Sequence, residues 1–402
     1  MSNWKNVFGI IWTGQLFSIL SSSIVSFALI LWLSFETGSA EVLALSALAA
    51  LLPQSVIGLV AGVYIDRWDR KRTMIAADSF IAFCTLLLAV LFFLNLAEIW
   101  HIYVLLALRS VGSAFHMPAM QASIPLLAPA DQLGRIAGIN QMLESVCNIA
   151  GPALGALFIG LMDISYILLL DVGGALMACL SLLFVRIPNP EQDENKRTGI
   201  WIELKEALHI VKKIKGITPL VLFSVLSTFV IMPVAVLFPL MTLKHFSGDA
   251  FQMSVVEVAW GAGMLLGGAV MGVFSIKTNK VILINLMYVL IGLSFYFSGI
   301  LPESGFWTFV FLTLAGGVAG SIYNACFITV IQIQIPPHIL GRIFSVYLSL
   351  ALLPSMIGLV AAGAIADAIG LSNMFIISGL LLCLIGLLSF AFRSMLVLGK
   401  SL

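Results

Sequence analysis

Five ionisable side chains lie inside long apolar stretches of this sequence: Asp78, Arg109, Glu144, Asp171 and Glu257. An ionised group at membrane depth costs at least about 2.5–3.5 kcal/mol on insertion scales, so each of these groups needs a partner, water or a proton. A carboxyl group in such a place can take up and release protons, and it can attract a cationic ligand. These residues therefore indicate proton or cation handling between helices.

The composition shows what kind of element holds them. Hydrophobic residues make up 61% of the chain and charged residues 10%, whereas soluble proteins have about half and a quarter. A helix needs about 20 apolar residues to cross a membrane. Twelve such stretches predict an all-α polytopic membrane protein with twelve transmembrane helices, at approximately 8–34, 41–65, 73–96, 101–127, 136–162, 165–186, 217–242, 250–275, 281–301, 306–334, 342–365 and 371–392.

Basic residues predict the orientation. If both termini and the even-numbered junctions share one side, that side holds eighteen of the twenty Lys and Arg residues. Lys244 falls on the other side, and Arg109 lies within a span. Because positive charge is retained in the cytoplasm, we expect a multi-pass protein of the plasma (inner) membrane with both termini cytoplasmic.

The longest polar stretch divides the chain into two bundles of six helices, 1–186 and 217–402, joined by a linker over 187–216. The linker carries a charged run, Glu191 to Arg197, and then a predicted amphipathic helix suited to lie on membrane lipid. A simple tether is an equal alternative. Pro129 to Ile136 and Pro336 to Ile343 share the pattern Leu-Gly-Arg-Ile at an offset of 207 residues. The two halves therefore form a parallel repeat, the architecture of a rocking transporter with a central site.

Glu144 is the strongest candidate for chemistry. Asn140, Glu144, Asn148, Gly151 and Gly155 follow one another at helical spacing and form one face of the fifth span. Burial favours a protonated carboxyl group and a nearby cation favours the carboxylate, which is the balance that a proton site needs. The alternative to proton or cationic-substrate handling is a static buried polar contact.

Arg109 lies roughly 12 Å deep in the fourth span by the helical rise, within reach of Glu144 or Asp171. A structural ion pair is one interpretation, and a pairing that changes on protonation is the other. His116, beside Pro118, is expected to pack or kink the helix rather than relay protons. Asp78 is expected to pair with the cluster Arg70 to Arg72.

Asp171 and Glu257 both lie about two turns from the outer surface. They either face an outward-open vestibule, where they attract cations, or remain hydrated at the level of the lipid headgroups. Trp260 follows Glu257 by three residues, so the two can share one wall of a cavity and contact an amphipathic amine.

The junction between the second and third spans concentrates charge between two apolar stretches. Gly58 and Gly62 form a small-residue ridge that allows helices to approach closely. Asp66 can cap the N-terminus of a neighbouring helix, while the basic residues after it can hold carboxylates or lipid phosphates. The alternative is a hairpin that only fixes topology.

Two motifs carry a resemblance to a known family. The loop Gly62-x-x-x-Asp66-Arg67-x-Asp69-Arg70-Lys71-Arg72 resembles the signature loop of the major facilitator superfamily, and Gly151-Pro152-x-x-Gly155 is similar to its antiporter motif. Trp12-Thr-Gly-Gln15 and the stretch from Arg109 to His116 look most like the macrolide-efflux branch of drug/proton antiporters. The resemblance implies that the Asp66 loop latches the cytoplasmic side near Gly341-Arg342, and that the Gly151-Pro152 element serves export.

The expected function is therefore a secondary transporter that exports amphipathic, macrolide-like drugs in exchange for protons by alternating access. The alternatives are a lipid or siderophore carrier on the same fold and a non-transporting membrane partner of an efflux ATPase. We find no phosphate-binding loop, catalytic triad, metal-ligand cluster or basic nucleic-acid face, so no cofactor, metal, nucleic acid or enzyme activity is expected. The partners are a small amphipathic substrate, protons and membrane lipid, and a monomeric state is compatible with them.

Overall fold

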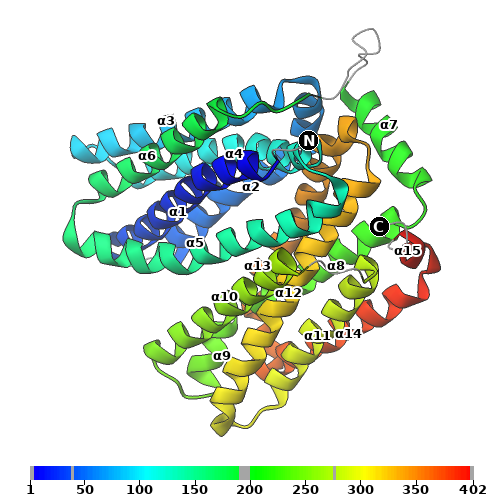
Figure 1. Ribbon diagram of the computed structural model, residues 1–402. Helices are drawn as coiled ribbons and strands as arrows, with labels where there is room; N and C mark the ends of the chain where they lie inside the picture. Colours follow the sequence, from blue (N-terminus) through cyan, green and yellow to red (C-terminus); the bar gives the residue numbers. More distant parts are fainter. Residues whose placement is uncertain (1–3, 38–39, 190–199, 275–277, 399–402) are drawn as a thin grey trace. The chain divides into compact units, whose positions relative to one another are not determined.

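The computed structural model describes residues 4–37, 40–189, 200–274 and 278–398 (Figure 1). All regular elements within these ranges are helices. Twelve helical segments among them are long and apolar enough to cross a membrane. The prediction of an all-α protein with twelve spans is confirmed.

The first six spans are α1 (Trp4–Thr37), α2 (Ala40–Arg67), α3 (Arg70–Phe93), α4 (Ile99–Leu127), α5 (Leu133–Leu161) and α6 (Ile164–Leu183). A short helical turn, η1 (Ala130–Gln132), precedes α5. Tight junctions are possible here because aspartates cap the following helices. Asp69 accepts a hydrogen bond from the Arg72 backbone N–H at 2.8 Å at the start of α3, and Asp163 accepts one from the Ser165 N–H at 2.8 Å at the start of α6.

The remaining helices are α7 (Ile200–Lys213), α8 (Ile217–Ala235), α9 (Phe238–Lys244), α10 (Ala250–Val273), α11 (Lys280–Ile300), α12 (Phe306–Gln334), α13 (Leu340–Ile369), α14 (Leu371–Ala391) and α15 (Arg393–Leu398), with short turns η3 (Glu303–Gly305) and η4 (Pro337–Ile339). The seventh span was expected to be one helix over 217–242, but α8 and α9 divide it. Pro233 lies in the last turn of α8 and Pro239 in the first turn of α9. Each proline removes a backbone donor, which favours a break between them.

The linker contains the helix that was predicted there, α7. The charged run Glu191–Arg197 lies outside the described residues, as do the side chains of Trp201 and Leu204. On the described part of α7, Val211 is buried, whereas Leu208 and Lys212 are exposed. The proposed contact of α7 with lipid stays a prediction.

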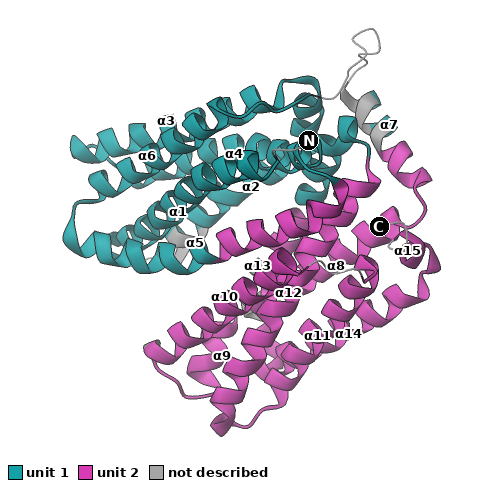
Figure 2. Ribbon diagram, viewed as in Figure 1, with its two compact units in different colours: residues 1–129, 146–207, 336–349 teal, residues 130–145, 208–335, 350–402 magenta. Residues whose placement is uncertain are grey.

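The chain divides into two compact units (Figure 2). Unit 1 comprises residues 1–129, 146–207 and 336–349, and unit 2 comprises 130–145, 208–335 and 350–402. Unit 1 thus includes the first part of α13, and unit 2 includes the first part of α5. The division of the chain into bundles 1–186 and 217–402 stays a prediction.

Each unit has its own core. In unit 1, α1 packs against α6, and α4 packs against α2 and α3; aliphatic side chains such as Val25, Leu88 and Ile167 are fully buried there. In unit 2, α11 packs against α14, and α12 packs against α10 and α11. The centre of this packing is aromatic, because the ring of Phe238 contacts the rings of Phe295, Phe309 and Phe375.

Candidate functional site

Four helices of unit 1 converge on one buried charge network. The Arg109 guanidinium on α4 lies 3.0 Å from Asp171 Oδ2 on α6, and it donates a hydrogen bond to Thr85 Oγ1 on α3 at 2.6 Å. Thr85 in turn donates to Asp171 Oδ2 at 2.8 Å, and Ser22 on α1 donates to Asp171 Oδ1 at 2.5 Å. Both oxygens of the carboxylate are therefore satisfied.

This network decides between the two partners that the sequence offered to Arg109, because the structure pairs it with Asp171. Asp171 was expected to face an outer vestibule or headgroup water, but only 2% of it is exposed. That expectation was wrong. The position of Asp171 in the sequence predicts how deep it lies in the membrane, but not the direction in which its side chain points. The guanidinium and the two hydroxyls compensate the charge of this buried carboxylate.

A second buried pair joins α3 and α4. His116 Nε2 lies 3.3 Å from Asp78 Oδ1, and both side chains are nearly inaccessible. The prediction that Asp78 pairs with the basic cluster after Asp69 was therefore wrong. Gly112 explains how the helices come close enough, because a Cβ there would lie 2.6 Å from a carbon of Ile81 on α3.

The Asp66 carboxylate makes more polar contacts than the other described carboxylates within the spans of unit 1. It accepts hydrogen bonds from the backbone N–H groups of Gly341 at 3.0 Å and Arg342 at 3.2 Å, at the start of α13. Its oxygens also lie 3.1 Å from the Arg342 guanidinium and 3.5 Å from that of Arg70. A helix N-terminus attracts an anion through its unpaired N–H groups and the helix dipole. Asp66 thus ties the end of α2 to the first turn of α13.

Gly62 is needed for this contact. A Cβ at Gly62 would lie 2.4 Å from the Cα of Arg342. This is a backbone atom, which cannot shift as the end of a flexible side chain can. Only glycine permits the approach that brings Asp66 to the amides of α13. The close contact of the small-residue ridge with another helix agrees with the sequence pattern.

Two basic residues of the loop, Arg70 and Lys71, donate hydrogen bonds to carbonyl oxygens, and Arg70 also lies beside the Asp66 carboxylate, as the sequence pattern predicted. Arg70 donates to the carbonyl of Ala122 at 2.6 Å and to that of Pro337, and Lys71 donates to the carbonyls of Leu183 at 3.1 Å and Val185 at 2.9 Å, at the end of α6. Carbonyl groups at a helix C-terminus carry the negative end of the dipole, which suits a lysine.

The other two positions of the loop have different surroundings. Asp69 accepts a hydrogen bond from Asn189 at 2.6 Å, which fastens the start of the linker to the loop. Arg67 is partly buried at the end of α2.

The pattern Gly151-Pro152-x-x-Gly155 lies within α5, which continues through Pro152 to Leu161. The glycines face α1. A Cβ at Gly151 would lie 2.1 Å from Ser23 Oγ, and a Cβ at Gly155 would lie 3.0 Å from the Ile24 carbonyl oxygen. The element therefore allows close packing of α5 on α1 within unit 1.

Glu144 has very different surroundings in unit 2. Among the described residues, its one polar contact is a hydrogen bond from Gln141 Nε2, one turn earlier on α5, at 3.5 Å. Gln141 is buried, and its Oε1 accepts a hydrogen bond from Asn324 Nδ2 on α12 at 2.7 Å. Within the parts of the chain that the structure describes, no basic side chain forms an ion pair with Glu144.

The polar stripe expected on α5 divides between the two units. Asn140 and Glu144 belong to unit 2, whereas Asn148 belongs to unit 1 and is exposed. On α10, Glu257 is exposed, but Trp260 packs on α12, where its ring lies 3.3 Å from the position of a Cβ at Gly316. The structure therefore places Trp260 against a glycine surface of α12, and leaves Glu257 accessible.

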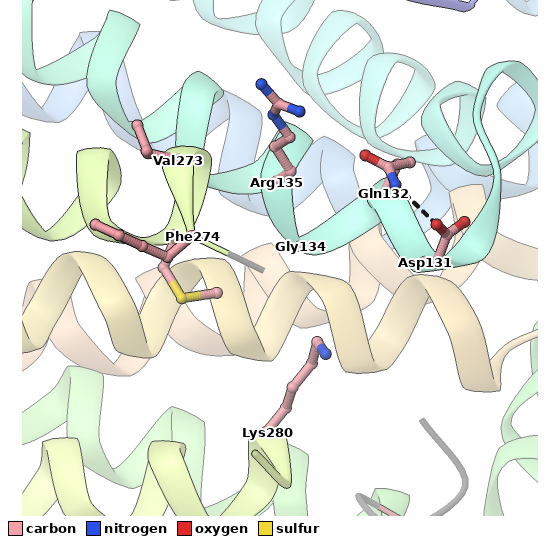
Figure 3. Close-up of a pocket in the computed structure, with 8 residues that line it drawn as sticks. Asp131, Gln132, Gly134, Arg135, Val273, Phe274 and Lys280 are labelled. Atoms are coloured by element: carbon pink, nitrogen blue, oxygen red, sulfur yellow. Dashed lines mark hydrogen bonds between the residues drawn. The ribbon is translucent and has the colours of Figure 1, made fainter. Parts of the chain in front are cut away.

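Figure 3 shows a small cavity of unit 2 that the sequence did not suggest. It has a volume of about 140 Å³ and lies where η1 and the start of α5 meet the end of α10 and the start of α11. Lys280 points toward the turn that contains Gly134, and Arg135 points away from Lys280. Asp131 also lines it and accepts a hydrogen bond from Gln132 at 2.7 Å.

Sequence reasoning missed the uncharged members of these clusters: Ser22, Thr85, Gln141 and Asn324. A weak signal existed for Gln141, which precedes Glu144 by three residues and so shares its side of the helix. No group of three His, Cys, Asp or Glu side chains among the described residues is arranged to hold a metal ion.

Comparisons with known proteins agree with this picture. Residues 11–351 match the family model described as Major Facilitator Superfamily. Macrolide efflux protein A of Streptococcus pyogenes is 36% identical over 385 residues, covering 95% of this chain and 95% of that protein. The multidrug efflux pump Tap of Mycobacterium bovis (strain BCG / Pasteur 1173P2) is 26% identical over 385 residues, covering 91% of this chain and 88% of that protein.

A solved structure of the E. coli fucose:proton symporter superposes with a TM-score of 0.77, covering 97% of this chain and 99% of that one. Its sequence is 14% identical, so this likeness shows the fold alone.

Proposed function

The chain belongs to the Major Facilitator Superfamily, and we propose that it exports amphipathic, macrolide-like drugs in exchange for protons. It is a multi-pass membrane transporter related to macrolide and multidrug efflux proteins, which confirms the resemblance found in the sequence. The similarity to macrolide efflux protein A over 95% of the chain carries the proposed substrate class. The surroundings of Glu144 support proton exchange.

The reasoning for Glu144 is electrostatic. A carboxylate at membrane depth that lacks a cation is costly in its ionised form, and an amide donor offsets only part of that cost. Protonation removes the charge, so the carboxyl group can change state as the surroundings change. Asp171 differs from Glu144, because the Arg109 guanidinium lies 3.0 Å away as a charged partner. We therefore assign proton coupling to Glu144 and a structural charge to Arg109 and Asp171.

We also assign contacts with the substrate to Asn140, Asn148 and Glu257. Asn140 shares the inner part of α5 with Glu144, and Asn148 and Glu257 are exposed. Polar side chains on otherwise apolar spans supply contacts for the polar groups of an amphipathic substrate, and a carboxylate can bind its amine. Glu257 is thus proposed to attract cationic drugs.

The contact of Asp66 with the start of α13 supports a latch role for the loop Gly62 to Lys71. Alternating access requires contacts that form in one state and break in another. Asp66 makes four contacts with three residues of α3 and α13, so its loss changes the stability of the state in which they meet. The antiporter element Gly151-Pro152-Gly155 is proposed to serve as the close-packed face of α5 during export.

The protein is proposed to lie in the plasma membrane with both termini in the cytoplasm, on the basis of the bias of Lys and Arg. Thr278 and Ser247 are exposed and fall in junctions on opposite sides of that topology. In a cysteine-free background, a cysteine at Ser247 should react with an impermeant maleimide in intact cells, and one at Thr278 should not. Labelling at Thr278 and not at Ser247 would show that the orientation is the opposite of the proposed one.

Proteoliposomes test the proposed exchange. A pH gradient should drive uphill accumulation of a macrolide, and addition of the drug should release protons. In Glu144→Gln, exchange of drug down its own gradient should persist, whereas uphill accumulation should be lost because the amide cannot release a proton.

The matched control is Glu303→Gln, which alters an exposed carboxylate in a turn between spans and should pump normally. If Glu144→Gln still pumps uphill, Glu144 has no role in coupling.

A further inference from the structure

We propose that Gln141 and Asn324 form a hydrogen-bond relay that passes the protonation state of Glu144 to α12. The relay rests on the proposed function, because it assumes that Glu144 is the residue that exchanges protons. Gln141 and Asn324 are positioning residues in this view, since they act through Glu144.

The contacts form a chain across two helices of unit 2. Asn324 Nδ2 donates to Gln141 Oε1 at 2.7 Å, and Gln141 Nε2 donates to Glu144 Oε2 at 3.5 Å. Gln141 is only 3% exposed, so water is a poor substitute for either contact. The α5 helix also lies close to α10 here, because a Cβ at Gly138 would be 2.5 Å from the Gly272 backbone nitrogen.

The chemistry of the amide gives the relay its direction. A glutamine side chain has an acceptor on one side and a donor on the other. While Asn324 donates to the oxygen of Gln141, the NH₂ group of Gln141 is turned toward Glu144, where it stabilises a carboxylate. A protonated Glu144 presents an O–H donor in addition to its remaining acceptor oxygen. Gln141 can accept from that donor only by turning its oxygen away from Asn324, so the proton and Asn324 compete for one acceptor.

Asn324 is well placed to transmit this change. The next residue toward the N-terminus of α12, Tyr323, shares a hydrogen bond of 2.5 Å with Ser224 on α8. The ring of Tyr323 also lies 4.9 Å from the ring of Tyr288 on α11. A shift at Asn324 therefore acts on a segment of α12 that is fastened to two further helices of unit 2.

The ionisable groups on the neighbouring helices do not contact Glu144 in the described part of the chain. On the helices that pack against the first part of α5, the described titratable side chains are Glu257 on α10, Lys280, Tyr288 and Tyr296 on α11, and Tyr323 and Cys326 on α12, while Arg135 lies on α5 itself. Within the described residues, none of them forms an ion pair or a hydrogen bond with Glu144. Gln141 is thus the contact through which its charge is sensed.

The test compares the pH dependence of drug accumulation in proteoliposomes for four proteins: wild type, Gln141→Met, Asn324→Leu and the double variant. Loss of the amide donor removes a contact of the carboxylate, so Gln141→Met should move the pH of half-maximal transport upward by about half to one unit. Asn324→Leu allows the Gln141 amide to turn, so it should raise the pH of half-maximal transport by a smaller amount. The double variant should match Gln141→Met, because the two residues act in series.

Asn285→Leu is the matched control, since it removes a fully buried amide of α11 that has no place in the relay, and it should leave the pH dependence unchanged. If Gln141→Met does not insert, Gln141→Glu replaces it, and repulsion between two carboxylates should give a larger shift in the same direction.

The outcomes separate the two proposals. If wild type and Glu144→Gln behave alike in a pH gradient, proton exchange at Glu144 is wrong and the relay falls with it. If Glu144→Gln loses uphill transport but the variants of Gln141 and Asn324 shift nothing, or shift the pH dependence additively, the relay is wrong and the role of Glu144 stands.

Discussion

The acids within the spans of the two units have different partners. In unit 1, Asp66 lies beside Arg70 and Arg342, Asp171 beside Arg109, and Asp78 beside His116. In unit 2, neither Glu144 nor Glu257 forms an ion pair within the described residues. A cation beside a buried carboxylate compensates its charge, whereas a carboxylate without one bears the cost of ionisation at membrane depth. The contrast suggests fixed charge in unit 1 and exchangeable charge in unit 2.

The largest effect on stability is expected for the buried ion pair of Arg109 and Asp171. Arg109→Gln leaves Asp171 buried without its cation, and Asp171→Asn leaves the guanidinium without its carboxylate. Breaking a buried pair on one side typically costs about 3–5 kcal/mol, whereas replacing both partners costs much less. Each single variant should therefore unfold at a clearly lower temperature in detergent, and the double variant Arg109→Gln/Asp171→Asn should recover much of the loss.

Thermal unfolding followed by size-exclusion chromatography measures this order, with Glu144→Gln as the comparison. That variant removes no ion pair and should unfold within a few degrees of wild type. Single variants of Arg109 and Asp171 as stable as wild type would show that the network contributes no fixed charge, and the contrast between the units would fail.

A smaller effect is expected at Asp66. Asp66→Asn keeps one acceptor but removes the charge, while Arg70 retains the carbonyls of Ala122 and Pro337. Hydrogen bonds to a charged group contribute about 1.5–3 kcal/mol, so the latched state should lose roughly tenfold or more in population. Drug efflux should fall by at least about tenfold while the amount of inserted protein stays near normal.

Asp69→Asn is the control for Asp66, because asparagine caps a helix about as well as aspartate, so it should retain most activity. Full efflux by Asp66→Asn at normal expression would reduce the loop to a signal for topology.

Sequence reasoning succeeded where a single stretch of residues is sufficient. Hydropathy and length predict the twelve spans because each helix must pair its own backbone N–H and C=O groups within the bilayer. The direction and partners of side chains depend on packing between distant segments. For this reason the sequence offered Arg109 two partners, gave Asp78 the wrong one and missed Thr85 altogether. The relay of Gln141 and Asn324 joins residues 183 positions apart, and uncharged polar residues are too common in spans to mark such a contact.

The smallest effect, and a control on the whole contrast, is expected at Asp163, which lies outside the spans at the start of α6. Hydrogen bonds from the Ser165 hydroxyl and backbone N–H hold the pKa of Asp163 below its usual value. A lowered pKa means that the cap stabilises the fold above the unfolded value of about 3.9 and weakens as pH falls through the folded value. Asp163→Ala should therefore lower the free energy of unfolding at neutral pH by about 1 kcal/mol or less. This difference from wild type should shrink only in acid, and the pH dependence of transport between about pH 5 and 8 should not change. Equilibrium unfolding and proteoliposome transport, each measured across pH, check the two halves of this prediction. A changed transport profile would mean that carboxylates outside the spans set the pH response, which removes the reason for assigning it to Glu144.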